Sequence, residues 1–475
     1  MSSEILINSA IGETRLALME QGKPAEIRLF RDHRQSLVGA IYYGRIISLS
    51  TEFQAAFVDL GHEITGFLPL SLLPKRPGKK PADLTSLLHE GQKIIVQVTA
   101  DATKGKSAKL TSRIEIISSA LILHPFREGA FVSSRIKDPK RREELKTFGN
   151  SLNLQGMGLT LRTEAEHTPT AVLKKTADRL IRHWTRALDN RDKKKIPFLL
   201  SQGPDNLLQI LREYGSSRHD RFIFDQPAAL KIAQSWAREF SPDLLDRMAL
   251  HYGSVPLFEH FAVEEELDQL FEKKITLPSG AWITIEQTEA LIAIDVNMGN
   301  ARQHNDPAKQ RYGINSEAAR EIFRQIRLRG LSGLIVIDFI NMSAAPATGS
   351  VTGQKSQSKS DVSNLLGIID TLILADNRQI QRSNLSAFGL LELARKSSHL
   401  SLQQQILSAN SPTATIETQA LALLRRAERE AAAKVGIPLY VKVAPDVQAW
   451  LKSQAHLLTA FIRRTGSKLE IKDKT

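Results

Sequence analysis

The sequence contains no cysteine in its 475 residues. This absence excludes disulfide bonds, thiolate nucleophiles and zinc sites built on cysteine. It is typical of proteins that work in a reducing compartment. A chain of this length is expected to form three or four compact units, each with its own apolar core.

Long apolar runs are also missing. No stretch approaches the roughly 20 apolar residues that a membrane-spanning helix needs. The first 30 residues alternate polar and apolar side chains and include four glutamates, so they lack the apolar centre of a signal peptide. We therefore expect a cytoplasmic protein without a membrane span.

An excess of negative charge is absent, because 64 lysines and arginines outnumber 51 aspartates and glutamates. The formal net charge of +13 at pH 7 predicts a polyanionic partner. The alternative is a basic protein whose charge serves no partner. Composition alone does not separate these two interpretations.

Two apolar runs that end in polar residues occupy positions 291–297 (LIAIDVN) and 334–341 (LIVIDFIN). Each has four consecutive aliphatic residues followed by an aspartate, a pattern that favours a buried strand. Between them, residues 316–328 carry apolar side chains at helical spacing, with Ser316 and Glu317 as the N-terminal cap and first-turn acid. A strand–helix–strand unit normally places its two strands parallel in one sheet.

Asp295 and Asp338 directly follow these aliphatic runs, and parallel strands would bring them to the same edge of a sheet. A carboxylate beside buried strands is costly unless a cation compensates it, and two neighbouring carboxylates repel each other. A hard divalent ion such as Mg²⁺ relieves both costs. Asn297 adds an amide on the same face. The alternative for a single strand-end aspartate is a helix cap or an arginine partner, but the matched pair favours a metal site.

Residues 36–118 contain short strand-like segments separated by turns, a pattern typical of a small closed barrel. Phe57 and Phe67 stand ten residues apart in neighbouring segments. The positive side chains nearby are Arg45, Lys104, Lys106, Lys109 and Arg113. Aromatic rings and cations together on a barrel surface can stack single-stranded bases and hold the phosphates. The alternative is that both phenylalanines belong to the barrel core.

A small mixed unit is expected from residue 120 to residue 200. Its candidate functional residues are Arg162 and Thr163, at the end of the strand-like segment 157–163 (MGLTLRT). A guanidinium and a hydroxyl at a strand end can clasp a terminal phosphate. Taken alone, an arginine–threonine pair is more often an ordinary surface feature, so both interpretations stay open.

The composition changes after the second apolar run. Residues 343–363 have no aromatic and almost no large aliphatic residue, which predicts a flexible loop before a helix from Leu365 to Asp376. Residues 412–475 are expected to form a small α/β unit in the order helix, strand, helix and strand. Ser279 and Gly280 predict a tight hairpin turn that leads into the first apolar run.

An ordered series of segments resembles the catalytic half of the ribonuclease E/G endoribonucleases. In family order the segments are SLVGAIYYGRI (36–46), QAAFVDLG (54–61), GFLPL (66–70), GMGLTLRT (156–163), LPSG (277–280), TEALIAIDVN (288–297), RGLSGLIVIDFINM (329–342) and FGLLELARK (388–396). The resemblance covers nearly the whole chain. It is far more specific than any single motif.

The resemblance implies an α/β (α+β) multidomain fold. Its implied parts are an RNase H-like subdomain (1–35 plus 206–270), an inserted oligonucleotide-binding β-barrel (36–118), a 5′-phosphate sensor-like domain (119–205), a nuclease-like catalytic subdomain (271–400) and a small C-terminal domain (412–475). The predicted flexible loop 343–363 would lie within the catalytic subdomain.

The resemblance also implies roles for the candidate residues. Asp295 and Asp338 match the ligands of Mg²⁺, and Asn297 matches the amide that helps to orient the scissile phosphate; these three are the implied catalytic residues. The implied RNA-binding residues are Phe57, Phe67 and Lys106, and the implied 5′-monophosphate pocket contains Arg162 and Thr163. The implied activity is Mg²⁺-dependent endonucleolytic cleavage of single-stranded A/U-rich RNA to leave 5′-monophosphate ends, in RNA processing or decay.

Several positions depart from the family pattern. The Cys-x-x-Cys zinc link expected between Arg395 and Pro412 is missing, so neither zinc nor a zinc-linked tetramer is expected, and a homodimer is the remaining candidate assembly. Asn341 stands where the family usually has aspartate. Met298 and Asn300 replace a small hydroxyl residue and a cation. These changes keep open an alternative, an RNA-binding paralogue with little or no catalytic activity.

Overall fold

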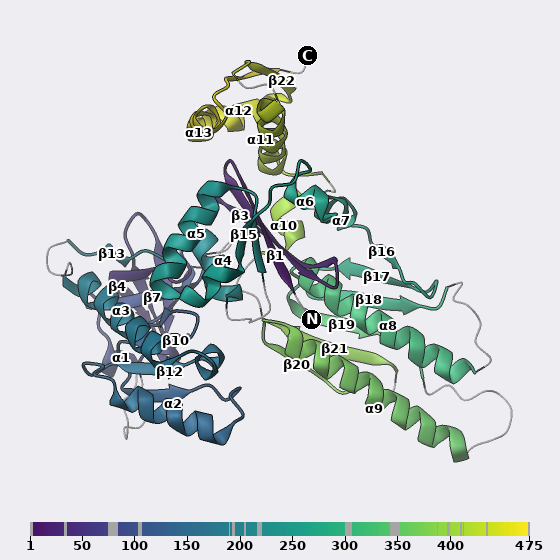
Figure 1. Cartoon of the computed structure of the whole chain (residues 1–475). Coiled ribbons are helices and arrows are strands. Elements are labelled where there is room, and N and C mark those ends of the chain that lie inside the picture. Colours follow the sequence, from purple (N-terminus) through teal and green to yellow (C-terminus); the bar gives the residue numbers. More distant parts are fainter. Residues whose placement is uncertain are drawn as a thin grey trace. The chain divides into compact units, whose positions relative to one another are not determined.

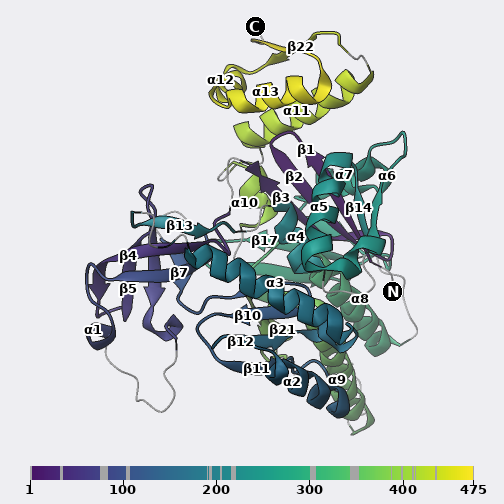
Figure 2. The same cartoon turned by 60° about the vertical axis from the view of Figure 1, so that its left-hand side comes forward.

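The computed structural model describes residues 3–32, 36–74, 84–102, 107–189, 191, 195–203, 206–215, 221–299, 306–342, 352–386, 388–396, 400–408, 411, 413–433 and 436–473. It is a mixed α/β structure whose internal contacts define two compact units. The first unit comprises Met1–Thr14 and Phe30–Tyr252, and the second comprises Arg15–Leu29 and Gly253–Thr475. Figures 1 and 2 show the helices and strands of both.

The first unit contains strands that pair in parallel, with β14 paired to both β1 and β15. Ile5, Leu6 and Ile7 of β1 are all fully buried, as expected for a parallel strand covered on both faces. These elements are β1 (Glu4–Ala10), α4 (Asn206–Tyr214), β14 (Arg221–Phe224), α5 (Pro227–Phe240), the 3₁₀-helix η5 (Pro242–Arg247) and β15 (Met248–Leu250). The boundary between the two units passes through β2 (Glu13–Glu20) and β3 (Lys23–Arg31).

Five strands of the first unit close into a barrel, as the sequence predicts. The order is β4-β5-β6-β8-β7, and β7 pairs back onto β4. Ala56, Val58, Leu68 and Leu110 are among the buried side chains that fill it. The elements are β4 (Ile41–Ser50), β5 (Ala55–Asp59), β6 (Thr65–Pro69), η2 (Leu70–Leu72), α1 (Leu84–Leu87), β7 (Lys93–Ala100), β8 (Ala108–Thr111) and β13 (Phe198–Ser201), which also pairs with β4.

A four-stranded sheet follows the barrel in the sequence, with the order β11-β12-β10-β9. Its elements are β9 (Ile116–Ile117), β10 (Leu121–His124), β11 (Gly129–Val132), α2 (Pro139–Ser151), β12 (Gly158–Leu161), η3 (Thr163–Glu166) and α3 (Thr170–Asp189). Helix α2 begins at Pro139 because Asp138 caps it and accepts a hydrogen bond from the Lys140 amide (3.0 Å). Helix α3 buries Leu173 and Trp184 in the core shared with this sheet. The predicted small mixed unit is therefore present.

The second unit contains a six-stranded sheet with the order β16-β17-β18-β19-β21-β20. Its strands are β16 (Lys274–Thr276), β17 (Trp282–Gln287), β18 (Ile292–Asn297), β19 (Gly333–Asp338), β20 (Ile380–Arg382) and β21 (Leu390–Arg395). β18 and β19 are parallel, and the other neighbours are antiparallel. Helix α8 (Pro307–Leu328) lies between β18 and β19 in the chain, so the predicted strand–helix–strand unit is confirmed. The predicted hairpin at Ser279 and Gly280 joins β16 to β17.

One face of this sheet packs against α8 and α9 (Thr352–Ala375). The core there includes Ile294 and Ile337 from the strands, Ile322 from α8 and Ile369 from α9. Because side chains alternate along a strand, the intervening residues point away from this core. We call the opposite side of the sheet the open face; it carries Lys274, Trp282, Thr284, Asp295, Asn297 and Asp338.

Two predicted helix starts are wrong. Helix α8 begins at Pro307 rather than Ser316, and its cap is Asp306, whose Oδ1 accepts a hydrogen bond from the Ala308 amide (2.9 Å). Ser316 is instead buried in the middle of this helix. Helix α9 begins at Thr352, so residues 352–363 of the predicted flexible loop are helical. Residues 343–351 of that prediction lie outside the described residues.

The last part of the second unit ends in two parallel strands, β22 and β23. The elements are α6 (Leu257–His260), α7 (Val263–Gln269), α10 (Leu402–Ile406), α11 (Ile416–Ala433), β22 (Leu439–Val443), α12 (Pro445–Ser453), α13 (Ala455–Thr465) and β23 (Leu469–Asp473). The predicted order of helix, strand, helix and strand is confirmed, except that the second helix is divided into α12 and α13. Among the described residues, none of the helices combines the length and apolar character needed to cross a bilayer.

Candidate functional site

An acid pair lies on the open face of the six-stranded sheet. The parallel register of β18 and β19 places Asp295 directly beside Asp338. Both side chains are exposed, because each follows a buried isoleucine and strand alternation turns it away from the core. Backbones of neighbouring strands lie about 4.8 Å apart, so both carboxyl groups emerge from the same part of the face. The parallel placement predicted from the sequence is confirmed.

The two carboxylates disfavour each other's charge. Partial burial and then the negative charge of Asp295 raise the pKa of Asp338 above its ordinary value. Asn297 lies two residues beyond Asp295 on the same face, and its Nδ2 donates a hydrogen bond to Asp295 Oδ2 (2.7 Å). This bond orients the Asp295 carboxylate, and the amide oxygen of Asn297 is a further oxygen donor close to the pair.

The backbone after the second acid is held by a buried amide from α8. Asn315 Nδ2 donates to the Ile340 carbonyl oxygen (2.8 Å), and Asn315 Oδ1 accepts from the Ile340 amide (3.1 Å). Asp338 stands only two residues before Ile340, so this two-bond clamp fixes the exit from β19. Gly389 directly precedes β21, the strand that pairs with β19. It has φ +90°, and a Cβ there would lie 2.7 Å from the Phe339 carbonyl oxygen. Only glycine permits this close approach.

Asn315 was missed by reasoning from the sequence. Its side chain is 0% exposed. The available signal was an amide next to the apolar stripe of a helix, at a position where a polar side chain must find partners. Its partner, the backbone of residue 340, is not visible in a sequence pattern.

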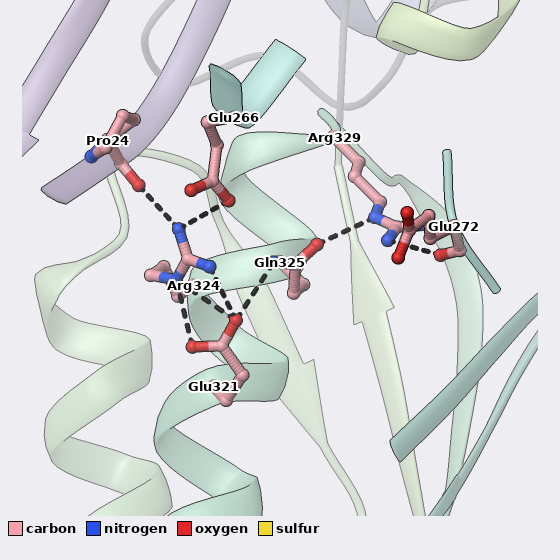
Figure 3. Close-up of polar contacts among 7 residues, drawn as sticks. All are labelled: Pro24, Glu266, Glu272, Glu321, Arg324, Gln325 and Arg329. Atoms are coloured by element: carbon pink, nitrogen blue, oxygen red, sulfur yellow. Dashed lines mark hydrogen bonds and ion pairs between the residues drawn. The ribbon is translucent and has the colours of Figure 1, made fainter. Parts of the chain in front are cut away.

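The C-terminal end of α8 is fixed by a polar network, shown in Figure 3. Arg324 Nη1 donates to the Pro24 carbonyl oxygen (2.9 Å) and to Glu266 Oε1 (3.0 Å), and its Nη2 donates to Glu321 Oε1 (2.7 Å). Burial alone would lower the pKa of Arg324, but the hydrogen bonds and charges of Glu321 and Glu266 outweigh it and raise that pKa. The positive charge of Arg324 is therefore well compensated by the two glutamates.

A second arginine of this network ends the helix. Arg329 Nε donates to Gln325 Oε1 (2.8 Å), and its Nη2 donates to the Glu272 carbonyl oxygen (2.9 Å). Gln325 Nε2 in turn donates to Glu321 Oε1 (2.9 Å), which links the two arginines. Burial lowers the pKa of Arg329 to about 10. The helix that carries Asn315 is thus tied to three other segments of the second unit.

The acid pair fits a hard divalent cation. Its donors are carboxylate oxygens with an amide oxygen beside them, the ligand type that Mg²⁺ prefers. In the part of the chain that the structure describes, no group of three or more His, Cys, Asp or Glu side chains forms a fuller metal site. Mg²⁺ commonly binds one or two carboxylates and completes its shell with water and substrate phosphates. A pair of aspartates is therefore enough for such an ion.

An aromatic pair lies on the outside of the barrel. Phe57 of β5 and Phe67 of β6 are direct cross-strand partners, with ring centroids 5.7 Å apart and an interplanar angle of 63°. Both rings are partly exposed, whereas their strand neighbours Val58 and Leu68 are fully buried in the barrel core. The two phenylalanines therefore form a surface feature rather than part of that core.

The cations predicted near the aromatic pair have different environments. Lys109 is exposed and pairs with Phe67 across β6 and β8, so its side chain starts beside the rings. Arg113 has a structural role instead, because its Nε donates to the Leu73 carbonyl oxygen (3.0 Å) and its Nη2 donates to the Ser71 carbonyl oxygen. Lys106 lies outside the described residues.

Arg162 and Thr163 follow β12, as the sequence predicts. Arg162 Nη1 donates to the carbonyl oxygens of Ser118 (2.8 Å) and Ser119 (3.0 Å). Burial lowers the pKa of Arg162, so its positive charge is poorly compensated by solvent. The hydroxyl of Thr163 lies 3.4 Å from Ser133 Oγ. A partly desolvated guanidinium has a charge that an anion could compensate.

A mixed sheet with a strand-end acid pair, together with a closed barrel that displays an aromatic pair, is typical of metal-dependent enzymes that act on nucleic acids. The chain belongs to the ribonuclease E/G family, because the sequence model of that family matches residues 115–398. The resemblance noted from the sequence segments is thereby confirmed.

Three relatives illustrate the range of similarity. Ribonuclease E of Escherichia coli (strain K12) is 32% identical over 433 residues, which cover 88% of this chain but 40% of that protein. Ribonuclease G of the same strain is 29% identical over 470 residues, covering 96% of this chain and 93% of that protein. Ribonuclease E of Haemophilus influenzae is 32% identical over 393 residues, covering 81% of this chain and 40% of that protein. The chain thus spans less than half of these ribonucleases E and nearly all of the ribonuclease G.

Proposed function

We propose that this protein is a Mg²⁺-dependent endoribonuclease that cleaves single-stranded, A/U-rich RNA and leaves 5′-monophosphate ends, in RNA processing or decay. The observation that carries the proposal is the register of β18 and β19, which sets Asp295 beside Asp338 with Asn297 on the same open face. Family membership and the net charge of +13 support RNA as the substrate.

The acid pair has the chemistry for this reaction. When bound, a divalent cation supplies charge that polarises a phosphoryl oxygen and makes water a stronger nucleophile. Asp295 and Asp338 would hold that cation through their oxygens. Asn297, bonded to Asp295, would keep this carboxylate oriented and position the scissile phosphate. Asn315 would preserve the spacing of the acids by fixing the backbone after Asp338.

The barrel and the four-stranded sheet have supporting roles in the proposal. Phe57 and Phe67 would stack single-stranded bases, and Lys106 would contact the phosphates beside them. Arg162 and Thr163 would bind the 5′-monophosphate of the RNA; the burial of the Arg162 guanidinium supports this role because an anion would compensate its charge. In this proposal the barrel is the oligonucleotide-binding domain, and the sheet with α2 and α3 is the 5′-phosphate sensor.

The remaining domain assignments are also part of the proposal. The parallel strands β1, β14 and β15 support an RNase H-like subdomain formed by residues 1–35 and 206–270. The sheet that carries the acid pair would be the nuclease-like subdomain, and residues 412–475 the small C-terminal domain. Because the sequence has no cysteine, the proposal includes no zinc link between subunits. It takes a homodimer as the assembly and the cytoplasm as the location.

Cleavage of a single-stranded oligonucleotide tests the central claim. The parent protein should cut a 5′-monophosphorylated A/U-rich RNA in Mg²⁺, and Asp295→Ala or Asp338→Ala should slow cutting by at least about 100-fold, the scale expected for a group that stabilises transition-state charge. Asp268→Ala is the matched control, because Asp268 is an exposed aspartate of α7 in the same unit. Equal cutting by the acid-pair variants and the parent would refute the metal site.

A second candidate function is RNA binding with little or no cleavage. It is favoured by the small number of acids at the site, since the described residues provide a pair and no larger group, and by Asn341 where the family usually has aspartate. The same assay separates the two candidates. Binding of the oligonucleotide without Mg²⁺-dependent products would establish the second candidate and exclude the first.

A further inference from the structure

A lysine on the open face, at the far end of the row of residues that leads to the acid pair, is held by an aromatic ring. Lys274 of the edge strand β16 pairs with Thr284, and Thr284 pairs with Asp295. Asp295 pairs with Asp338, so one row across four strands begins at a cation and ends at the acid pair. The Lys274 Nζ lies over the ring of Trp282, 4.0 Å from its centroid.

The ring that holds this lysine is itself fixed. Trp282 pairs with Asn297 across β17 and β18, so it neighbours the amide of the acid pair. The backbone of Gly299 packs against the same indole, and a Cβ on Gly299 would lie 2.2 Å from a ring carbon. Gly299 also has φ +53°, a conformation that other residues rarely adopt. The chain after Asn297 therefore closes against Trp282 and limits the positions the ring can take.

Lys274 is exposed and has no other stabilising partner in the described part of the chain. It forms no ion pair or hydrogen bond with a described residue. The adjacent Lys273 differs, because its Nζ lies 3.2 Å from Glu286 Oε1. A cation–π contact orients an ammonium without neutralising it, so the Lys274 charge stays available to an anion.

We propose that Lys274, positioned by Trp282, binds a backbone phosphate of the RNA strand that flanks the scissile phosphate. The inference rests on the proposed function and adds a substrate-binding residue to it. The backbones of β16 and β18 are two strand spacings apart, about 10 Å, so a phosphate at the acid pair and a phosphate at Lys274 belong to different nucleotides. The ligand is a single phosphodiester group, and recognition does not depend on the base.

The positive charge of Lys274 would offset the repulsion between the acid pair and the RNA phosphates. Before a cation binds, the acid pair repels the phosphates of any strand that approaches the open face. A fixed positive charge on the same face attracts the strand and draws its flanking phosphate away from the carboxylates. Such a contact should contribute mainly to substrate binding, and little to the chemical step.

Salt-dependent binding tests the proposal without requiring cleavage. The affinity of a fluorescent single-stranded RNA is measured in EDTA over a range of salt concentrations for the parent, Lys274→Gln and Lys273→Gln. Loss of one phosphate contact should reduce the slope of log affinity against log salt by about 0.7 for a single strand. We expect this reduction for Lys274→Gln, whereas Lys273→Gln, a variant with the same charge change one residue away, should keep the parent slope.

Steady-state kinetics of Lys274 and Trp282 variants provides a second test. Lys274→Gln should raise KM by up to about fivefold and leave kcat within twofold, and Lys274→Arg should restore KM. Trp282→Leu should give part of the same KM increase because the ammonium loses its position. An unchanged salt slope for Lys274→Gln, or equal slopes for Lys274→Gln and Lys273→Gln below that of the parent, would overturn the proposal. Because binding is measured without metal, failure of the proposed cleavage would be seen separately.

Discussion

The acid pair and the aromatic pair are built by the same geometry and have opposite energetics. Each consists of two identical side chains placed directly opposite each other on neighbouring strands, Asp295 with Asp338 and Phe57 with Phe67. The phenyl rings attract each other at 5.7 Å and need no further support. The carboxylates repel each other, and the structure around them compensates with the Asn297 hydrogen bond and the Asn315 clamp. Two side chains that repel each other need hydrogen bonds from other residues to hold them in place. Two side chains that attract each other are held in part by their own contact.

Removing the Asn315 clamp should have the largest effect, because it would let the backbone after Asp338 move and displace this acid from Asp295. Asn315→Ala leaves the buried amide and carbonyl of Ile340 without partners, which should cost on the order of 2–4 kcal/mol of unfolding free energy. Cleavage should also fall by roughly 100-fold, since displaced catalytic groups lose their alignment. Urea unfolding would measure the loss of unfolding free energy. Single-turnover cleavage, at a temperature about 20 °C lower than the melting temperature of the variant, would measure the loss of activity.

Gln325→Ala is the matched control for the clamp. Gln325 is another buried amide of α8, with its partners in the network of Figure 3 rather than at the strand end. This variant should lose a similar amount of unfolding free energy and keep its cleavage rate while folded. If both variants lost the same fraction of cleavage, Asn315 would be a stability residue without a role in positioning Asp338.

Removing one ring of the aromatic pair should weaken RNA binding without affecting the acids. Phe57→Ala should cost on the order of 1–3 kcal/mol of affinity for a short single-stranded RNA, the usual value for a stacked base. Mg²⁺ affinity should stay that of the parent. Phe53→Ala provides the comparison, because Phe53 is an exposed phenylalanine just before β5 that is 64% exposed. Equal losses in both variants would show that the cross-strand pair has no special role.

The smallest expected effect is a change in stability when the charge repulsion of the acid pair is removed. In EDTA, Asp338→Asn should raise the unfolding free energy by a few tenths of a kcal/mol, about 0.5 at most, because a repulsion between directly opposed like charges disappears. In excess Mg²⁺ the parent should gain stability and the variant should gain less, because an ion that binds the folded state stabilises it. Thermal unfolding in both buffers measures this. A loss of stability for Asp338→Asn in EDTA would mean that the pair is not repulsive.

The parallel placement of the two acids could be predicted because two sequence patterns indicate it. Each run has four aliphatic residues before its aspartate, and the helical stripe between the runs indicates a crossover. The partners of the acids could not be predicted in the same way. The Asn315 clamp joins a side chain to a backbone group, and backbone groups leave no trace in the choice of residue at position 340.

The helix starts were missed for a physical reason that both share. Apolar periodicity detects the part of a helix that packs on a core, and the first turns of α8 (PAKQRYG) and α9 (TGQKSQSKSD) contain few or no aliphatic residues. Serine favours the cap position, so the sequence predicts Ser316 as a cap, whereas this residue lies buried in the third turn of α8. The capping residue Asp306 was a competing signal ten residues earlier.

The return of β13 to the barrel also limits how the chain can be divided. Residues Phe198–Ser201 pair with the first half of β4 after the chain has passed through the whole four-stranded sheet. The segment between is consequently fastened to the barrel at both ends. Excising residues 119–205 would remove β13 from beside Tyr42 and Tyr43, which would then pair with β7 alone. The side of β4 exposed in this way is the kind of strand edge through which proteins aggregate. A barrel expressed without the four-stranded sheet therefore needs this returning strand, or a substitute for it, to avoid aggregation.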